Sequence, residues 1–337
     1  MPQVVQFDEH GDPEVLHLVD EPVIEPGPGE VRVKIEAFAV NALDVMTRAG
    51  TPPMTAVLPH ARSGVEATGV IDAVGPDVTT VAVGDAVIFT AVPDAAARGT
   101  SAEYTTVPAS WVTMRPAGLD VADAAAVWVG FSTAYGALIE KAGMQPGDVV
   151  LITASTGSVG RAAIQIAARI GAVPIAVTRR SARRGELLAA GAAAVVGLDQ
   201  EDLVAAVLDH TGGRGADIVL DLVRGPGQER LAAAARPGGT VIAAGFLDPR
   251  PVAPAATDVT VIDYASFEHT TDPTAVARMA AFLNAGVRDG GLRPVIDRMY
   301  PLDEVVAAHR RVESGAHAGR KVVVTVLDTS GAHAAPC

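Results

Sequence analysis

Short apolar runs separated by turn residues fill the chain up to about residue 120. The run VRVKIEAFAV, residues 31–40, begins with a strict alternation of apolar and polar positions, which is typical of a half-buried strand. Two further runs, GVIDAVGPDV and VGDAVIFT, carry glycines that mark turns. This part of the sequence therefore predicts a mostly β region with little helix.

The periodicity changes after about residue 122. Apolar runs then alternate with helical stretches, which predicts βαβ units around a parallel sheet. The number of runs matches the six strands of a complete doubly wound nucleotide-binding domain. The expected strands are residues 149–153, 173–177, 192–196, 217–223, 240–245 and 259–264.

A long helical stretch, DPTAVARMAAFLNAGVRDG, follows residue 265, with Asp-Pro at its start and glycine at its end. A strand, a second helix and a closing strand, KVVVTV, come after it. We expect this last part to fold back onto the first domain. The predicted organisation is therefore a β-rich domain of residues 1–121 plus 265–337, interrupted by a doubly wound α/β domain of residues 122–264.

Composition and charge narrow the possible functions. The formal net charge of -13 disfavours nucleic-acid binding. The uncharged stretch 124–139 is shorter than the roughly 20 residues of a membrane span, and the N-terminus lacks the zones of a signal peptide. The one cysteine, Cys337, allows neither a disulfide within the chain nor a cysteine-based zinc site. We expect a soluble, cytoplasmic protein that acts on a small molecule.

A turn of small residues, STGSVG at 155–160, joins the first expected strand of the second domain to a helix. In dinucleotide folds such a turn brings backbone N–H groups and a helix N-terminus to a pyrophosphate. Gly157 would permit the close approach, and Gly160 would let the helix pack tightly on the strand. Ser155 stands where the usual G-x-G-x-x-G pattern has its first glycine, so a turn without a ligand stays an alternative. The candidate cofactor residues here are Ser155, Thr156, Gly157, Ser158, Val159 and Gly160.

Arginines crowd just after the second expected strand, in TRRSARR at 178–184. NAD-binding folds usually place a carboxylate there for the ribose 2′-hydroxyl, whereas guanidinium groups match a 2′-phosphate. Only three of the 26 basic residues are lysine, so arginine count alone carries little weight. A cluster of cations at a helix start is unfavourable without an anion. We predict NADP(H), with a solvated helix start as the alternative, and the expected contacts are Thr178, Arg179, Arg180, Ser181 and Arg184.

The chain as a whole resembles the medium-chain dehydrogenase/reductase superfamily, in its zinc-free quinone oxidoreductase and enoyl reductase branch. The resemblance covers nearly the whole chain and implies a GroES-like β-rich domain interrupted by a Rossmann domain. It rests on NALDVMTRAG, GVEATGVIDAVG, VGDAVIF, AAAVWVGFSTAYGAL, ASTGSVGRAAIQIA, GGRGADIVLDLV, RPGGTVIAAG and HRRVESGAHAGRKVVVTV, in this order.

The zinc enzymes of this superfamily carry metal ligands at three places that read Asn41, Val65 and Val129 here. None of these side chains is a zinc ligand, so the resemblance implies a reaction without a metal. The reaction that remains is hydride transfer from NADPH to a quinone, or to a C=C bond conjugated to a carbonyl. Such a reaction needs positioning and hydrogen-bond donors for the substrate oxygen.

Candidate catalytic residues follow from the resemblance. Enoyl reductases of this branch often carry a tyrosine shortly after the segment that ends at Gly50, and none is present here. Asn41 is the remaining candidate to orient substrate or nicotinamide. Thr133 and Tyr135 in GFSTAYG either reach the nicotinamide ribose or the substrate, or serve ordinary helix-start packing.

The end of the fifth expected strand should approach the nicotinamide, because ligands lie at the carboxyl ends of parallel strands. The expected contacts there are Ala244, Gly245 and Phe246. Arg224 replaces one of two glycines that the family commonly has after Val223; it either contacts a phosphate or is simply exposed.

Two other functions stay open, together with the oligomeric state. The protein is alternatively a tailoring reductase for one biosynthetic intermediate, or a non-catalytic NADPH-binding or redox-sensing protein. The sixth expected strand, DVTVIDYASF, should lie at the sheet edge. An unpaired apolar edge needs cover, and pairing with its own copy would supply it. We therefore expect a homodimer.

Overall fold

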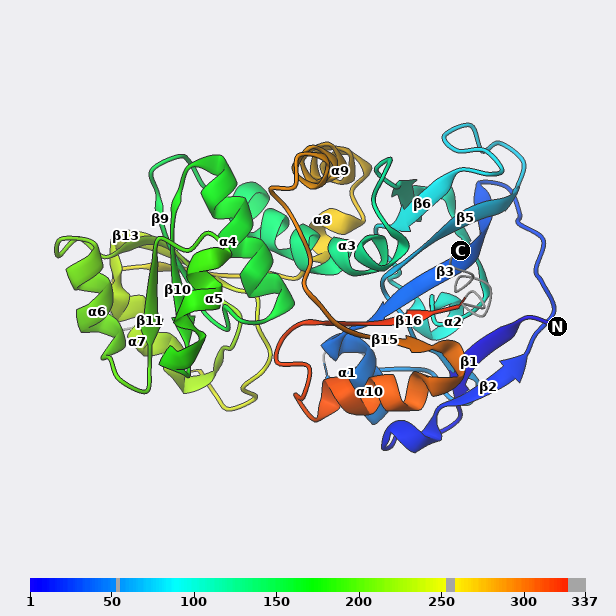
Figure 1. Cartoon of the computed structure of the whole chain (residues 1–337), viewed down its shortest axis with the longest axis horizontal. Coiled ribbons are helices and arrows are strands. Elements are labelled where there is room, and N and C mark those ends of the chain that lie inside the picture. Colours follow the sequence, from blue (N-terminus) through cyan, green and yellow to red (C-terminus); the bar gives the residue numbers. More distant parts are fainter. Residues whose placement is uncertain (53–54, 253–257, 327–337) are drawn as a thin grey trace, which may run out of the picture. The chain divides into compact units, whose positions relative to one another are not determined.

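The structure, a computed structural model, describes residues 1–52, 55–252 and 258–326 (Figure 1). Cys337, the one cysteine of the chain, lies outside these residues. The chain divides into two compact units. Of the described residues, the β-rich unit comprises those within 1–129 and 294–326, and the Rossmann unit those within 130–293.

Two sheets build the β-rich unit. A three-stranded sheet has the order β2-β1-β4, and a seven-stranded sheet has the order β15-β16-β3-β5-β6-β8, with β7 paired to β3. The strands are β1 Gln3–Phe7, β2 His17–Asp20, β3 Glu30–Val40, β4 Ala61–Arg62, β5 Ala67–Val74, β6 Ala86–Phe89, β7 Tyr104–Pro108, β8 Val112–Met114, β15 Ile296–Pro301 and β16 Lys321–Thr325. Its helices are α1 Ala42–Ala49, α2 Ala95–Arg98 and α10 Val305–Glu313.

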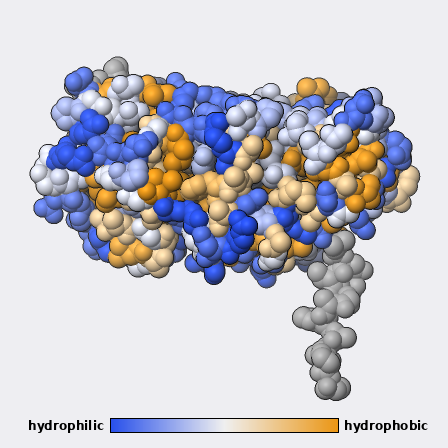
Figure 2. Space-filling model, turned by 90° about the horizontal axis from the view of Figure 1, so that it is seen from above, coloured by the Kyte–Doolittle hydropathy of each residue, from blue (hydrophilic) through white to orange (hydrophobic). Residues whose placement is uncertain are grey.

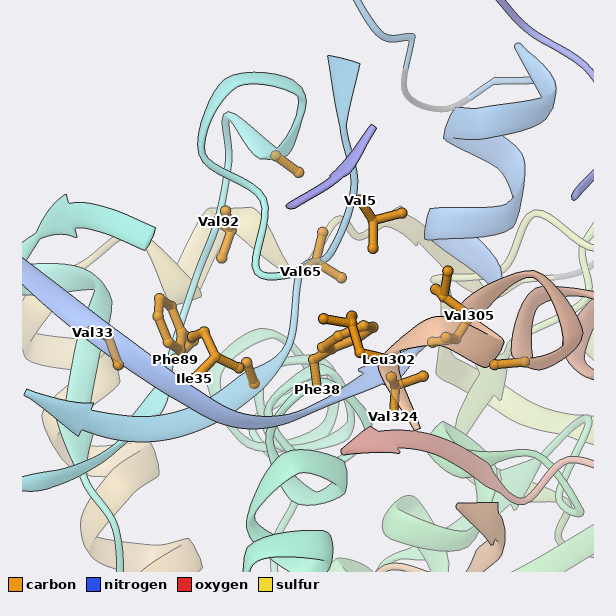
Figure 3. Packing of buried hydrophobic residues seen from close by; sticks show 14 of the residues in the cluster. Val5, Val33, Ile35, Phe38, Val65, Phe89, Val92, Leu302, Val305 and Val324 are labelled. Atoms are coloured by element: carbon orange, nitrogen blue, oxygen red, sulfur yellow. The ribbon is translucent and has the colours of Figure 1, made fainter. Parts of the chain in front are cut away.

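The hydrophobic core of this unit contains side chains from both its N-terminal and its C-terminal segments. Strand β16 pairs antiparallel with β3, in register from Val322 with Val40 to Thr325 with Ala37. Figure 3 shows side chains of β3 packed with those of β16 and α10, including Phe38, Val324 and Val305. A fully buried Val, Ile or Phe side chain contributes roughly 1.5–3 kcal/mol. The expected return of the C-terminal segment is confirmed for residues 294–326.

One parallel sheet forms the centre of the Rossmann unit, with the order β11-β10-β9-β12-β13-β14. This order is that of a doubly wound nucleotide-binding fold, as the sequence predicted. The strands are β9 Val149–Ile152, β10 Val173–Thr178, β11 Ala194–Gly197, β12 Ala216–Asp221, β13 Ala235–Ala243 and β14 Thr260–Asp263. The helices are α4 Ser158–Ile170, α5 Arg184–Ala189, α6 Leu203–His210, α7 Gln228–Ala234, α8 Phe267–Thr270 and α9 Pro273–Arg288.

The expected domain boundaries at 121/122 and 264/265 differ from those of the structure. Helices α8 and α9 belong to the Rossmann unit, where Arg278 pairs with Glu140 at 2.7 Å and Asp289 with Arg169 at 2.8 Å. Hydrophobic periodicity predicts a helix but does not say which domain its charged face will contact. The first boundary lies inside helix α3 Val121–Tyr135, because its first turns pack in the β-rich unit.

Helix α3 continues as a π-helix, Gly136–Lys141. Within the part of the chain that the structure describes, Val121–Lys141 is the one helix long and apolar enough to cross a membrane, and 72% of its most apolar window is buried inside the protein. That burial is the property of a core helix. On the face shown in Figure 2, hydrophilic and hydrophobic residues are interspersed.

Candidate active site

The turn before helix α4 presents backbone donors that have no partner within the described part of the chain. Gly157 is the N-cap residue, and the first α-helical bond runs from the N–H of Arg161 to its carbonyl at 2.9 Å. The N–H groups of Ser158, Val159 and Gly160 therefore precede any acceptor within the helix. Together with the partial positive charge of the helix N-terminus, they are suited to a phosphate group.

Two features of this turn hold it in place. A Cβ atom on Gly160 would lie 2.6 Å from the carbonyl oxygen of Ala154 and 2.6 Å from the Cα of Ser155, so only glycine fits there. Ser155 is fully buried; its hydroxyl donates to the carbonyl of Ile152 at 2.6 Å and accepts from the N–H of Val177 at 3.0 Å. The side chain of Ser155 thus ties the turn to β10 and has no donor left for a cofactor.

Arg161 is a residue that the sequence reasoning missed. Its Nε donates to the carbonyl of Thr156 in the turn at 3.0 Å. Its Nη2 lies 3.0 Å from Glu186 on α5, close enough for an ion pair although not aligned as a hydrogen bond. Arg161 therefore connects the turn before α4 to the helix that follows the arginine-rich segment.

Carboxylates already engage part of the arginine-rich segment. Ser181 donates from both its backbone N–H and its hydroxyl to Asp199, at 2.8 and 3.1 Å. Arg184 pairs with Glu201 at 2.6 Å. Arg179 and Arg180 are exposed, and neither guanidinium has a partner within the described part of the chain. Of the expected 2′-phosphate contacts, these two are the ones available to an anion.

The carboxyl ends of β12 and β13 are bound tightly together. The carbonyl of Asp221 accepts from the N–H groups of Ala244 and Gly245, both at 2.9 Å. A Cβ on Gly245 would lie 2.0 Å from the carbonyl carbon of Leu222, so only glycine allows this approach. Phe246 follows and is 39% exposed. The three expected nicotinamide contacts therefore stand at the carboxyl edge of the sheet, where ligands bind in folds of this kind.

Arg224 lies at the same edge with an unusual backbone. Its φ is 67° and its ψ is −155°, a backbone conformation that residues other than glycine rarely adopt. Its N–H donates to the buried Asp221 carboxylate at 2.9 Å, and its guanidinium pairs with Asp263 on β14. In this structure the arginine is thus committed to an ion pair.

Tyr135 and Thr133 lie in the last turns of α3, so the expectation of a helix start is wrong. Tyr135 is 7% exposed, and its ring packs against Phe282 of α9 with centroids 5.1 Å apart. Burial raises the pKa of its hydroxyl, with the nearby Glu140 adding to this effect. Thr133 is half-buried.

In the β-rich unit, Asn41 stands at the N-terminus of α1 within a buried polar network. Asp44 accepts from the backbone N–H of Asn41 at 2.8 Å and from that of Gly64 at 3.0 Å. Burial raises the pKa of the Asp44 carboxyl to about 6, although both of these bonds favour its charged form. The two bonds fix the start of α1 beside the segment that contains Val65 and Glu66.

Lys321, at the start of β16, completes this network. Its Nζ donates to Oδ1 of Asn41 at 2.6 Å and to Oε2 of Glu66. Oε1 of Glu66 accepts from the N–H of Val129 at 2.7 Å. The segments that contain Asn41, Val65 and Val129 are therefore linked by hydrogen bonds in this network. The ammonium group of Lys321 is part of it. Lys321 is one of only three lysines in an arginine-rich chain, and this was the available sequence signal.

The described residues contain no group of three His, Cys, Asp or Glu side chains that could hold a metal ion. Family models match two segments: the alcohol dehydrogenase GroES-like domain at residues 27–117 and the zinc-binding dehydrogenase model at residues 190–324. Human quinone oxidoreductase is 30% identical over 326 residues, which are 96% of this chain and 97% of that protein. The chain belongs to the medium-chain dehydrogenase/reductase superfamily, in its quinone oxidoreductase and enoyl reductase branch.

Solved structures give the same fold. A mycobacterial protein complexed with NADPH is 29% identical with a TM-score of 0.83, covering 96% of this chain and 100% of that one. The CurK enoyl reductase is 26% identical with a TM-score of 0.83, covering 96% and 99%. An NAD-dependent alcohol dehydrogenase is 32% identical with a TM-score of 0.82, covering 97% and 100%. The chain is thus an oxidoreductase of a nicotinamide-dependent family.

Proposed function

We propose that the protein is a zinc-independent, NADPH-dependent reductase of quinones or of α,β-unsaturated carbonyl compounds. When bound, the cofactor would supply the hydride. The observation that carries this proposal is a pair of candidate anion sites in the Rossmann unit, namely the N–H groups at the start of α4 and the guanidinium groups of Arg179 and Arg180, which have no partner among the described residues. The names of the quinone oxidoreductase and enoyl reductase relatives support the substrate class.

The cofactor preference can be tested on the arginine-rich segment. We expect NADPH to bind more tightly than NADH, because Arg179 and Arg180 can pair with the 2′-phosphate. Changing both to Ala should weaken NADPH by about ten- to a hundredfold while leaving NADH nearly unchanged, as for the loss of one charge-assisted contact or more. Fluorescence titration of both cofactors measures this. Equal dissociation constants in the unaltered protein would refute the preference.

Arg184→Ala is the matched control for that double variant. It removes a guanidinium from the same segment, but one that Glu201 already holds. We expect it to change NADPH affinity much less than the double variant. If Arg184→Ala weakens NADPH as strongly, the phosphate contacts have been assigned to the wrong arginines.

Zinc independence has its own test. Asn41, Val65 and Val129 offer no thiolate or imidazole, so the purified protein should hold no stoichiometric zinc and should keep its activity in a chelator. Elemental analysis that finds about one zinc per chain contradicts this part of the proposal.

Two alternative functions differ from this proposal in whether and with which substrate NADPH is oxidised. A tailoring reductase would oxidise NADPH only with its own specialised substrate, whereas a non-catalytic or redox-sensing protein would bind NADPH without turnover. Loss of NADPH absorbance with a panel of quinones and enones separates the three functions. The acidic composition and the burial of the one long apolar helix among the described residues support a soluble protein, which we place in the cytoplasm.

A further inference from the structure

The amide of Asn41 has no hydrogen-bond donor left for a substrate. One N–H of its Nδ2 can donate to the carbonyl of Ala39 and the other to Oε2 of Glu66, both at 3.2 Å. An amide nitrogen has only two N–H groups, so its capacity is filled. Its oxygen is also engaged, since it accepts from Lys321. The candidate that sequence reasoning favoured is therefore occupied by its neighbours.

Lys321 differs from Asn41 in this respect. An ammonium group has three N–H donors, and the Nζ of Lys321 has two acceptors, Asn41 and Glu66. Within the described residues no third acceptor is present. The side chain is 4% exposed, and that of Glu66 is fully buried. A positively charged donor with one unused N–H is thus held in a nearly water-free place, where its effect on a nearby charge is strong.

The neighbours of Lys321 fix its head group from several directions. Glu66 balances its charge and is itself held by the N–H of Val129, and Asn41 is held by the carbonyl of Ala39. Burying an ion pair is costly and is poor evidence for a purely stabilising role. A fixed, buried cation with a spare donor has instead the properties of a group that stabilises charge developing on an oxygen.

We propose that Lys321 binds the carbonyl oxygen of the substrate, and that Asn41 and Glu66 position its ammonium group. This inference rests on the proposed function. Hydride adds its electron pair to the β-carbon of the conjugated substrate, and the C=C electron pair shifts so that the carbonyl oxygen becomes negative. Lys321 donates its third N–H to that oxygen. The oxygen's electron pair then re-forms the C=O bond as the α-carbon takes a proton from water, and the hydroxide left behind is neutralised by the solvent. The substrate has thereby gained two electrons and two hydrogens.

The kinetic experiment compares Lys321→Met with Arg48→Met, a matched control. Arg48 is also a cation of the β-rich unit, fully buried and paired with Glu313 at 2.7 Å, and among the described residues no bond links it to Asn41, Glu66 or Lys321. Lys321→Met should lower kcat with menadione about a hundredfold or more, as for other lost oxyanion donors, with NADPH affinity nearly unchanged. Arg48→Met should keep kcat. A loss of NADPH affinity as large as the loss of kcat overturns the proposal.

A binding experiment tests the same residue without turnover. 4-Nitrophenol, added with NADP⁺ below its solution pKa, should bind as the coloured phenolate, because its oxygen resembles the developing oxyanion. Lys321→Met should abolish this absorbance and Lys321→Arg should keep part of it. Unchanged phenolate binding in Lys321→Met overturns the proposal, whether or not the enzyme reduces quinones. Phenolate binding that depends on Lys321, in a protein that reduces no quinone or enone, would leave the anion site standing while the proposed function fails.

Two measurements distinguish misfolding of the Lys321 variants from loss of the ammonium group, namely the melting temperature and chemical rescue. Lys321→Ala leaves space for a small amine, so methylammonium should restore phenolate binding and part of kcat in proportion to its concentration. Absence of rescue in a variant that melts like the unaltered protein counts against a direct role of the ammonium group.

Discussion

At the scale of single residues, Arg224 shows what a departure from the family pattern does to a backbone. Its φ and ψ lie in a region that is essentially restricted to glycine and that costs other residues roughly 1–3 kcal/mol. Its N–H bond to the buried Asp221 holds it there. The ion pair with Asp263 is largely exposed and is worth about 0–1 kcal/mol. The strain therefore outweighs the gain from the side chain.

We expect Arg224→Gly to raise the free energy of unfolding by about 1 kcal/mol, after allowing for the greater freedom of glycine in the unfolded chain. Arg224→Ala is the control, because it removes the same ion pair and keeps the strained Cβ. Urea denaturation should show a gain for Gly and none for Ala. A loss in both variants would show that the ion pair, and not the backbone, decides stability here.

For single residues, the sequence indicated which polar side chains could bind a ligand, but it did not show which other residues they pair with in the fold. Arg184 and Ser181 were predicted as contacts of a 2′-phosphate, yet Glu201 and Asp199 engage them in the structure. Those carboxylates come some 17 to 18 residues later in the chain, and only the parallel pairing of β10 with β11 brings them near. Lys321 was missed for the same reason, since its partners lie about 250 residues and more before it.

At the scale of elements, the turn and helix α4 were predictable because their glycines have geometric reasons. The strands agree within a few residues, apart from β13, which begins five residues earlier than the expected strand. There the segment from Ala235 contains a proline and two glycines, which read as a turn, and the register of β12 on β13 shifts. The local sequence pattern therefore predicted that each strand exists more accurately than it predicted the residue at which the strand begins.

The glycine at position 160 gives an element-scale prediction. In Gly160→Ala the new Cβ meets backbone atoms that cannot move cheaply, so the free energy of unfolding should fall by about 1–3 kcal/mol. Gly185→Ala, in helix α5, is the control: a Cβ there meets nothing within 4 Å, and stability should rise by about 0.5–1 kcal/mol. Thermal melting and urea denaturation measure both. Equal effects at the two positions would mean that α4 does not pack on its turn as described.

At the scale of the whole molecule, the fold class followed from the change of periodicity near residue 122, whereas the division into units did not. A helix such as α9 carries an apolar face that either domain could cover. In the structure α9 belongs to the Rossmann unit, where Arg278 and Asp289 also pair with other elements. Long-range charge pairing leaves no periodic signal in the sequence, so this part of the architecture required the structure.

Strand β14 has features that concern the oligomeric state of the protein. Among the described strands it ends the Rossmann sheet and pairs with β13 alone, and Val261 is 43% exposed. The N–H of Tyr264 donates to Ala243, toward β13. Because successive residues of a strand direct their backbone groups to alternate sides, the N–H of Val261 faces the free edge. This edge offers both backbone groups and an apolar side chain to a second copy.

We expect a homodimer in which two β14 strands pair across a two-fold axis. Light scattering at micromolar concentration should then give twice the 34.3 kDa of one chain, and a mass near 34.3 kDa rejects the dimer. Val261→Pro removes an N–H that faces outward and leaves the pairing with β13 intact, so it should yield folded monomers. Circular dichroism confirms the fold of that variant. A dimer that persists in Val261→Pro would place the interface elsewhere, because a proline at the centre of a four-residue strand cannot donate the bond that an edge-to-edge pairing requires.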